Sequence, residues 1–178
     1  MSRDFDALAD LIREHLREIP DYPEEGVLFR DITPLLADGS AFSEVIRAIA
    51  AHYRGAVDAV AGLESRGFIL AAPLAIELGV GMITMRKAGK LPPPVIGIDY
   101  ALEYGTARLE VRPDTIHEGQ RVLIIDDVLA TGGTARAAVD LVEQSGGSVT
   151  GLVMLMELLG LEGRSKLEGY EVETMLAY

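Results

Sequence analysis

Residues 122–135, VLIIDDVLATGGTA, place an apolar run, two aspartates and a Thr-Gly-Gly-Thr turn one after another. Val122 to Ile125 are consecutive apolar residues, mostly β-branched, which is typical of a strand buried on both faces. Asp126 and Asp127 then follow at the carboxyl end of that strand, where open α/β sheets bind ligands. Carboxylates at such a place can accept hydrogen bonds from paired hydroxyls or attract a hydrated divalent cation.

The turn from Thr131 to Thr134 indicates an anion site. Glycines let the backbone approach a ligand closely, and a turn that leads into a helix directs unpaired N–H groups at one point. From these residues alone a simpler interpretation stays open, in which the aspartates are caps and the glycines only shape the turn. A Walker-type nucleotide site is disfavoured because no Gly-Lys-Ser/Thr follows the glycines.

The 178-residue length fits a single domain over residues 1–178, which would bury roughly 70% of its unfolded surface. The sequence has no cysteine, so disulfides, thiolate metal sites and a cysteine nucleophile are excluded. The amino terminus lacks the apolar core of a signal peptide, and the longest comparable run, Ile69 to Ile76, is too short to span a bilayer. We therefore expect a soluble, cytoplasmic protein.

The net charge of −12, from 28 acidic and 16 basic residues, argues against nucleic acid or an anionic membrane as a partner. An acidic protein that binds a polyanion needs cations gathered at the site. These can be basic side chains or metal ions.

Apolar residues recur at helical spacing from Phe5 to Ile19, which predicts a helix ended by Pro20, and again from Phe42 to Tyr53. After them strands and helices alternate, which predicts a doubly wound, mainly parallel sheet flanked by helices. The expected strands are 57–61, 82–85, 121–125, 149–156 and one near 172–176, with helices at 67–78 and 133–145.

The stretch from Ile96 to Val111 breaks this alternation with a period of two around Glu103-Tyr104-Gly105. That pattern predicts an antiparallel hairpin. A hairpin beside a parallel sheet is a candidate lid over a ligand site.

Two further segments bring basic residues to predicted strand ends. Arg66, in Gly62–Phe68, offers a planar fork of donors suited to phosphate oxygens. Arg86, Lys87 and Lys90 follow the next strand in a loop shaped by glycine and proline. Solvated surface positions are the alternative for all four, although together they could offset the local acidity.

The 122–135 string closely resembles the 5-phosphoribosyl-1-diphosphate (PRPP) motif of the type I phosphoribosyltransferases. With the segments around Arg66 and Lys87, Leu28–Asp31 and Leu102–Gly105, the chain resembles the adenine phosphoribosyltransferases along nearly its whole length. The resemblance implies that adenine and PRPP are converted to adenosine monophosphate (AMP) and diphosphate with Mg²⁺, in purine salvage, by a homodimer. It also implies a small amino-terminal hood at 1–36 and a flexible catalytic flap at 95–112.

Two other functions stay open. One is a phosphoribosyltransferase for hypoxanthine, guanine or xanthine, because base identity depends on few contacts. The other is a PRPP-responsive regulator without catalysis, which this acidic chain with no room for a second domain disfavours.

The same resemblance implies roles for individual residues. The ribose hydroxyls and the 5-phosphate would be held by Asp126, Asp127, Ala130, Thr131, Gly132, Gly133 and Thr134. The diphosphate would be bound by Ser65, Arg66, Arg86, Lys87 and Lys90. The adenine pocket would be formed by Leu28, Phe29, Arg30 and Leu158, although core packing is the default for these apolar residues taken alone.

Catalysis would involve Glu103, Tyr104 and Arg66. By resemblance Glu103 would exchange a proton near N7 of adenine, and Tyr104 would cover the closed site. Without the resemblance a solvated hairpin tip is the better interpretation. No direct protein ligand is predicted for magnesium, which PRPP would carry near Asp126 and Asp127, and the Glu64–Ser65 peptide would be cis.

Overall fold

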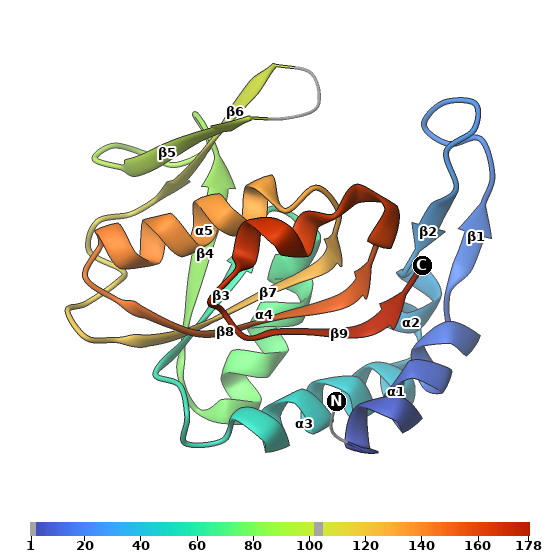
Figure 1. Cartoon of the computed structure of the whole chain (residues 1–178). Coiled ribbons are helices and arrows are strands. Elements are labelled where there is room, and N and C mark those ends of the chain that lie inside the picture. The colour runs from blue at the N-terminus through green and yellow to red at the C-terminus, as the bar shows by residue number, and fades with distance from the viewer. Residues whose placement is uncertain (1–2, 102–104) are drawn as a thin grey trace.

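In the computed structural model, which describes residues 3–101 and 105–178, the chain opens with a helix and a small antiparallel sheet (Figure 1). Helix α1 is Arg3–Glu14, and strands β1 (Arg17–Ile19) and β2 (Phe29–Asp31) pair with each other. The prediction that the first helix reaches Ile19 was therefore wrong. Residues 17–19 leave the helical pattern because they pair in register with residues 29–31.

Helices α2 (Thr33–Ala37) and α3 (Gly39–Tyr53) follow and lead into the main sheet. Asp38 caps α3 by accepting hydrogen bonds from the backbone N–H groups of Ser40 and Ala41. The main sheet has seven strands in the order β5-β6-β4-β3-β7-β8-β9. Their bounds are β3 Ala59–Leu63, β4 Gly81–Lys87, β5 Ile96–Ala101, β6 Thr106–Val111, β7 Arg121–Leu129, β8 Ser148–Glu157 and β9 Val172–Ala177.

Strands β4, β3, β7, β8 and β9 are parallel, whereas β5 and β6 are antiparallel. Helix α4 (Arg66–Leu78) connects β3 to β4, and α5 (Gly133–Gln144) connects β7 to β8. Two short 3₁₀ turns, η1 (Leu159–Leu161) and η2 (Gly163–Leu167), lie between β8 and β9. The predicted α/β fold with a mainly parallel sheet flanked by helices is confirmed.

Strand β7 shows why this sheet is buried on both faces. Leu123 and Ile125 pack into the core on the side of α1, α3 and α4, whereas Val122 and Ile124 pack into the core on the side of α5. All four are fully buried. In Figure 1, α5 lies on one side of the sheet and α1 and α3 lie on the other.

The strand order fixes where a ligand can bind. The chain passes from β3 through α4 to β4 on one side of β3, and returns through β5 and β6 to β7 on the other side. The connection that leaves the carboxyl end of β3 runs to β4, and the connection that leaves β7 runs to β8, so the two lead away from each other. Such a switch point is where open α/β sheets form a ligand crevice.

Strands β5 and β6 form the predicted antiparallel hairpin, from Ile96 opposite Val111 to Ala101 opposite Thr106. In Figure 1 this hairpin and the β1–β2 sheet stand on opposite sides of the molecule. Residues 102–104, which include Glu103 and Tyr104, lie outside the described residues. Among the helices in the described ranges, none is long and apolar enough to cross a membrane.

Candidate functional site

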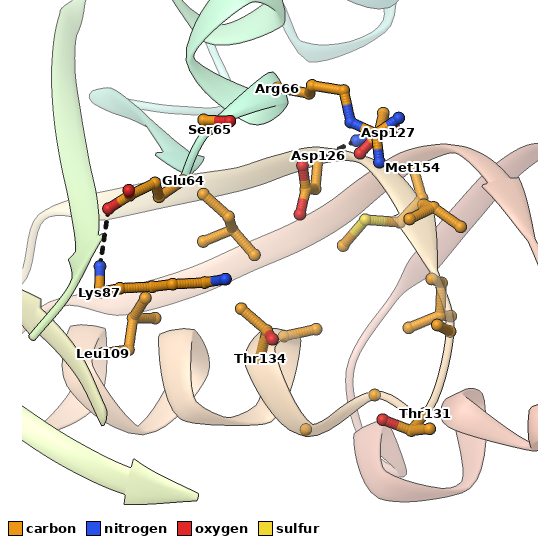
Figure 2. A pocket seen from close by; sticks show the side chains of 17 residues that line it. Glu64, Ser65, Arg66, Lys87, Leu109, Asp126, Asp127, Thr131, Thr134 and Met154 are labelled. Carbon is orange, nitrogen blue, oxygen red and sulfur yellow. Dashed lines mark hydrogen bonds and ion pairs between the residues drawn. The ribbon is translucent and has the colours of Figure 1, made fainter. Parts of the chain in front are cut away.

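A cavity of about 340 Å³ opens at the carboxyl ends of β3, β4 and β7. Figure 2 shows side chains from these separate segments turned toward one space. The cavity is lined by residues 63–66, Lys87, Leu109, residues 126–135 and Met154. The three strand ends at which the sequence predicted ligand-binding residues therefore lie around one cavity.

The two aspartates lie in the cavity wall, but not beyond the end of their strand. The prediction that the strand stops at Ile125 was wrong, because β7 continues to Leu129 by pairing with β8, with Asp126 opposite Met154. The Asp127 N–H donates to Asp126 Oδ1 at 2.9 Å. Asp127 is only 3% exposed.

Burial raises the pKa of both carboxyls. For Asp126 the neighbouring charge of Asp127 raises the pKa further, whereas for Asp127 the nearby Arg66 guanidinium opposes the rise. Asp127 Oδ2 is buried and accepts no hydrogen bond from the described residues. A buried carboxylate pair with spare acceptor capacity fits a ligand that brings hydroxyl donors and a divalent cation.

Arg66 begins α4 directly beside this pair. Its Nη1 lies 3.0 Å from Asp127 Oδ2, in an ion pair. The next residue, Gly67, makes this approach possible, because a Cβ there would lie 2.7 Å from the Ile125 carbonyl oxygen and 3.1 Å from Asp126 Oδ1. The glycine lets the start of α4 pack against β7, and Arg66 is thereby placed at the aspartates.

Glu64 organises the basic loop after β4. Its side chain is 7% exposed, and its carboxylate pairs with Lys90 Nζ at 2.9 Å and Arg86 Nε at 3.3 Å. The same carboxylate accepts the Lys87 backbone N–H at 2.8 Å. Burial opposes ionisation, but these donors outweigh it and hold the pKa of Glu64 below its ordinary value.

The three basic side chains of this loop therefore differ in whether they reach the cavity. Lys87 lines the cavity, and in Figure 2 its side chain extends across the space between Glu64 and Thr134. Arg86 and Lys90 pair with Glu64 and are not among the lining residues. Sequence patterns could not reveal this division, because all three residues look alike in a basic loop.

With the substrates that the resemblance implies, we expect Glu64→Gln to raise the KM for PRPP about tenfold while leaving the KM for adenine unchanged. The amide keeps the shape of the side chain but loses the charge that holds Arg86 and Lys90, and hydrogen bonds to charged groups contribute about 1.5–3 kcal/mol. Steady-state kinetics in both substrates would test this. Glu44→Gln, at an exposed position on α3, is the matched control. An unchanged KM for PRPP in the folded variant would mean that the loop does not depend on Glu64.

The turn after β7 has the geometry of an anion site. Gly132 adopts a left-handed conformation with φ of +74°, which glycine tolerates without strain, and α5 begins at Gly133. The first N–H groups of a helix have no partner within the helix, so those of α5 are available to an anion. Thr134 Oγ1 donates to the Tyr100 hydroxyl at 3.3 Å. All five predicted phosphate residues, 130–134, line the cavity.

A second, smaller cavity of about 140 Å³ adjoins the first. The predicted adenine residues Leu28, Phe29, Arg30 and Leu158 all line it, although residue 158 is distant in the sequence from the others. Its remaining lining residues are Val27, Arg66, Asp127, Val128 and Met156. Val128 and Met156 were not predicted, because an apolar residue in a strand carries no sequence signal of a pocket.

Contacts around Phe29 and Arg30 shape this smaller cavity. The Tyr22 ring meets the Phe29 ring edge-on with centroids 5.2 Å apart, and Arg66 Cζ lies 5.4 Å from the Phe29 centroid. Arg30 Cζ lies 3.6 Å from the centroid of the Tyr178 ring, at the other end of the chain. Arg66, Asp127 and Val128 line both cavities, so one ligand can extend from one into the other.

The Glu64–Ser65 peptide is cis, as the resemblance implied. Ser65 and Arg66 lie in the wall of the larger cavity. Glu103 and Tyr104 belong to the undescribed residues, so Arg66 is the member of the predicted catalytic set that the structure places.

Known proteins resemble this chain along nearly its whole length. Residues 35–176 match the phosphoribosyl transferase domain family. An adenine phosphoribosyltransferase of Roseiflexus sp. is 54% identical over 172 residues, which cover 96% of this chain and 98% of the relative. The crystal structure of the enzyme of that name from Thermoanaerobacter pseudethanolicus has a TM-score of 0.91 at 47% identity, with 96% of this chain and 99% of that chain covered.

A third relative was crystallised with ligands. The Saccharomyces cerevisiae adenine phosphoribosyltransferase, complexed with adenine and an imino-altritol 1,6-bisphosphate, has a TM-score of 0.91 at 40% identity over 96% of this chain and 99% of that chain. Identity of this extent along the whole fold, together with the family match, shows that the chain belongs to the adenine phosphoribosyltransferases of the phosphoribosyltransferase family.

Proposed function

We propose that this protein transfers the 5-phosphoribosyl group of PRPP to N9 of adenine, with release of diphosphate and AMP, in purine salvage. The observation that carries the proposal is the pair of adjoining cavities with Arg66, Asp127 and Val128 in their common wall. The smaller cavity suits a flat base and the larger one a phosphorylated sugar. The yeast relative that was crystallised with adenine and a bisphosphate supports the same assignment.

In the larger cavity, the carboxylates of Asp126 and Asp127 accept hydrogen bonds from the ribose 2- and 3-hydroxyls. Ala130 to Thr134 surround the 5-phosphate with backbone N–H groups and threonine hydroxyls. Asp127 Oδ2, which pairs with Arg66 but accepts no hydrogen bond from the described residues, and the start of α5, where the N-cap Gly132 makes no side-chain hydrogen bond, support these roles. They hold the sugar with its C1 facing the wall shared with the smaller cavity.

Ser65, Arg66 and Lys87 contact the diphosphate, while Arg86 and Lys90, paired with Glu64, add to the positive field around it. As the bond from ribose C1 to the diphosphate oxygen breaks, negative charge grows on the diphosphate, and Arg66 and Lys87 stabilise it. Asp126 and Asp127 would lie near the Mg²⁺ that PRPP carries, and this ion would further neutralise the diphosphate.

In the smaller cavity, Leu28 binds the adenine edge through its backbone groups, and Phe29 and Leu158 pack on the two sides of the ring, with Arg30 behind them. As N9 bonds to ribose C1 in place of the departing diphosphate, neutral adenine must lose one ring proton, and by family resemblance Glu103 accepts it near N7. Tyr104 covers the site and excludes water when the hairpin closes.

The test is nucleotide formation from PRPP and Mg²⁺ with adenine, hypoxanthine, guanine or xanthine supplied in parallel. Formation of AMP from adenine, with the other bases inactive, is the expected result. Turnover of a different base would overturn the assignment of the smaller cavity. Tight PRPP binding without turnover of any base would instead favour the regulatory function.

We also propose a homodimer, supported by family resemblance and by an exposed apolar stripe on α4. Ile69 is 43% exposed and Ile76 is 82% exposed, with the exposed Ala72 between them on the same helix face. The expected cytoplasmic location remains a prediction that cell fractionation would test.

Sedimentation equilibrium of the protein should give twice the chain mass, and Ile76→Glu should weaken the dimer at least tenfold by placing a charge in an apolar interface. Leu161→Glu, which changes an exposed leucine of η1, is the control and should leave the mass unchanged. A monomeric wild type would contradict the proposal.

A further inference from the structure

The backbone of η2 packs directly against the backbone of the phosphate turn. A Cβ at Gly132 would overlap the Gly163 carbonyl oxygen and would lie 2.9 Å from the Gly163 carbonyl carbon. In the opposite direction, a Cβ at Gly163 would overlap the Ala130 carbonyl oxygen and would lie 2.8 Å from the Gly132 nitrogen. The two segments are 31 residues apart in the sequence and touch only because both glycines lack side chains.

The η2 turn is itself fixed to the sheet. Arg164 Nη2 donates to Glu157 Oε2 at 2.6 Å and Nε donates to Glu157 Oε1 at 3.1 Å, so one edge of the guanidinium binds both oxygens of the carboxylate. Arg164 Nη1 donates to the Val172 carbonyl oxygen at 2.7 Å, and Nη2 reaches Thr174 Oγ1 at 3.2 Å. Glu157 is 4% exposed at the end of β8, and Leu167 of η2 is buried in the core. The segment that supports the turn is therefore held by both β8 and β9.

We propose that Gly163 is a positioning residue for the phosphate turn. Its missing side chain lets the anchored η2 support Ala130 to Gly132 in the shape that presents the N–H groups of the turn to the 5-phosphate. The proposal rests on the function assigned above to residues 130–134. It means that η2, which lies outside the cavity lining, helps to set the affinity for the phosphorylated sugar.

The contact predicts what a single methyl group would do. The atoms that the new methyl group of Gly163→Ala would meet are backbone atoms of Ala130 and Gly132, which cannot rotate away as a flexible side chain could. Gly163 is not among the residues with a positive φ, so alanine fits its own backbone conformation. Since η2 is anchored by Arg164, the phosphate turn is the part that must shift, and a displacement of about 1 Å in a binding site can cost about 10²-fold.

The experiment compares Gly163→Ala with Gly160→Ala. Gly160 lies three residues earlier, in η1, where a Cβ would meet nothing within 4 Å and φ is not positive, so it is a matched control. For Gly163→Ala we expect the KM for PRPP to rise about 10- to 100-fold and the calorimetric Kd for AMP to rise similarly. The KM for adenine at saturating PRPP should stay within about twofold of wild type, and Gly160→Ala should behave as wild type.

Wild-type kinetics for a folded Gly163→Ala would overturn the proposal, and so would equal losses for PRPP and adenine, which indicate a general distortion. Failure of the proposed function looks different, because the wild-type protein itself would then show no PRPP-dependent turnover of adenine.

Arg164→Lys keeps the test possible if Gly163→Ala does not fold. Lysine retains the charge beside Glu157 but lacks the fork that also reaches Val172 and Thr174. We expect the KM for PRPP to rise several-fold, with the KM for adenine unchanged. A KM for PRPP equal to that of the wild type would show that the anchoring of η2 does not determine the shape of the phosphate turn.

Discussion

Asp127→Asn should lower kcat/KM for PRPP about 10³-fold and yet leave the free protein as stable as the wild type or more stable. The loss corresponds to about two hydrogen bonds to a charged acceptor, at about 1.5–3 kcal/mol each. Asparagine keeps the size of the side chain. It lacks the negative charge that strengthens the hydrogen bonds from the sugar hydroxyls and that pairs with Arg66. Steady-state kinetics with PRPP as the varied substrate measures the effect.

The stability side of this prediction follows from the pKa of Asp127, which burial raises. A carboxyl whose pKa is higher in the folded state contributes most to stability at low pH. That contribution falls as the pH rises from the unfolded value of about 3.9 through the raised folded value. Asparagine does not ionise, so the melting temperature of the variant relative to wild type should be more favourable at neutral pH, above the raised pKa of Asp127, than near pH 4, where the contribution of the wild-type carboxyl is still largely present.

Asp58→Asn is the informative control. The hydrogen bonds from Arg121 lower the pKa of Asp58 to about 2, so its contribution to stability is present at neutral pH and is lost as the pH falls through that value. This exposed pair lies outside both cavities. Asp58→Asn should therefore lower the melting temperature slightly at neutral pH and leave the PRPP kinetics unchanged. If Asp127→Asn also lowered the melting temperature slightly and left the PRPP kinetics unchanged, the assignment of Asp127 to sugar binding would be wrong.

Lys87→Met should lower kcat/KM about 10²- to 10³-fold and weaken inhibition by diphosphate. Removal of one preorganised contact to developing negative charge costs about 2.7–4 kcal/mol in comparable sites. The Lys87 side chain enters the cavity, while its backbone N–H bonds to Glu64, and methionine preserves that backbone contact. The KM for adenine should stay unchanged, because Lys87 does not line the smaller cavity.

The neighbouring lysine provides the matched control for this change. Lys90 pairs with Glu64 and does not line the cavity, so Lys90→Met should cost less than about tenfold. A loss from Lys90→Met as large as that from Lys87→Met would show that the loop acts through its total charge. The orientation of Lys87 would then not matter.

The sequence was sufficient for the fold class because its pattern changes from helical to strand periodicity with each element. Element ends were less predictable, since they depend on partners. Residues 17–19 have apolar spacing that suits a helix, but pairing with residues 29–31 makes them a strand. Pairing with β8 likewise extends β7 through both aspartates to Leu129.

The residues that line the larger cavity were predictable where they are continuous in the sequence, as from Asp126 to Thr134. Residue roles were not predictable where they depend on contacts between distant segments. Glu64 gains its role only when Arg86 and Lys90 fold onto it. Gly163 gains its role only when η2 lies against the phosphate turn, and a glycine in a loop carries no sign of such a contact.

A crystal structure of the complex with AMP would test most directly the claim that one ligand spans both cavities. We predict that the adenine ring lies between Phe29 and Leu158, the ribose hydroxyls lie on Asp126 and Asp127, and the 5-phosphate lies in the turn at 131–134. Density for the base in the larger cavity, or for the phosphate away from that turn, would contradict the account.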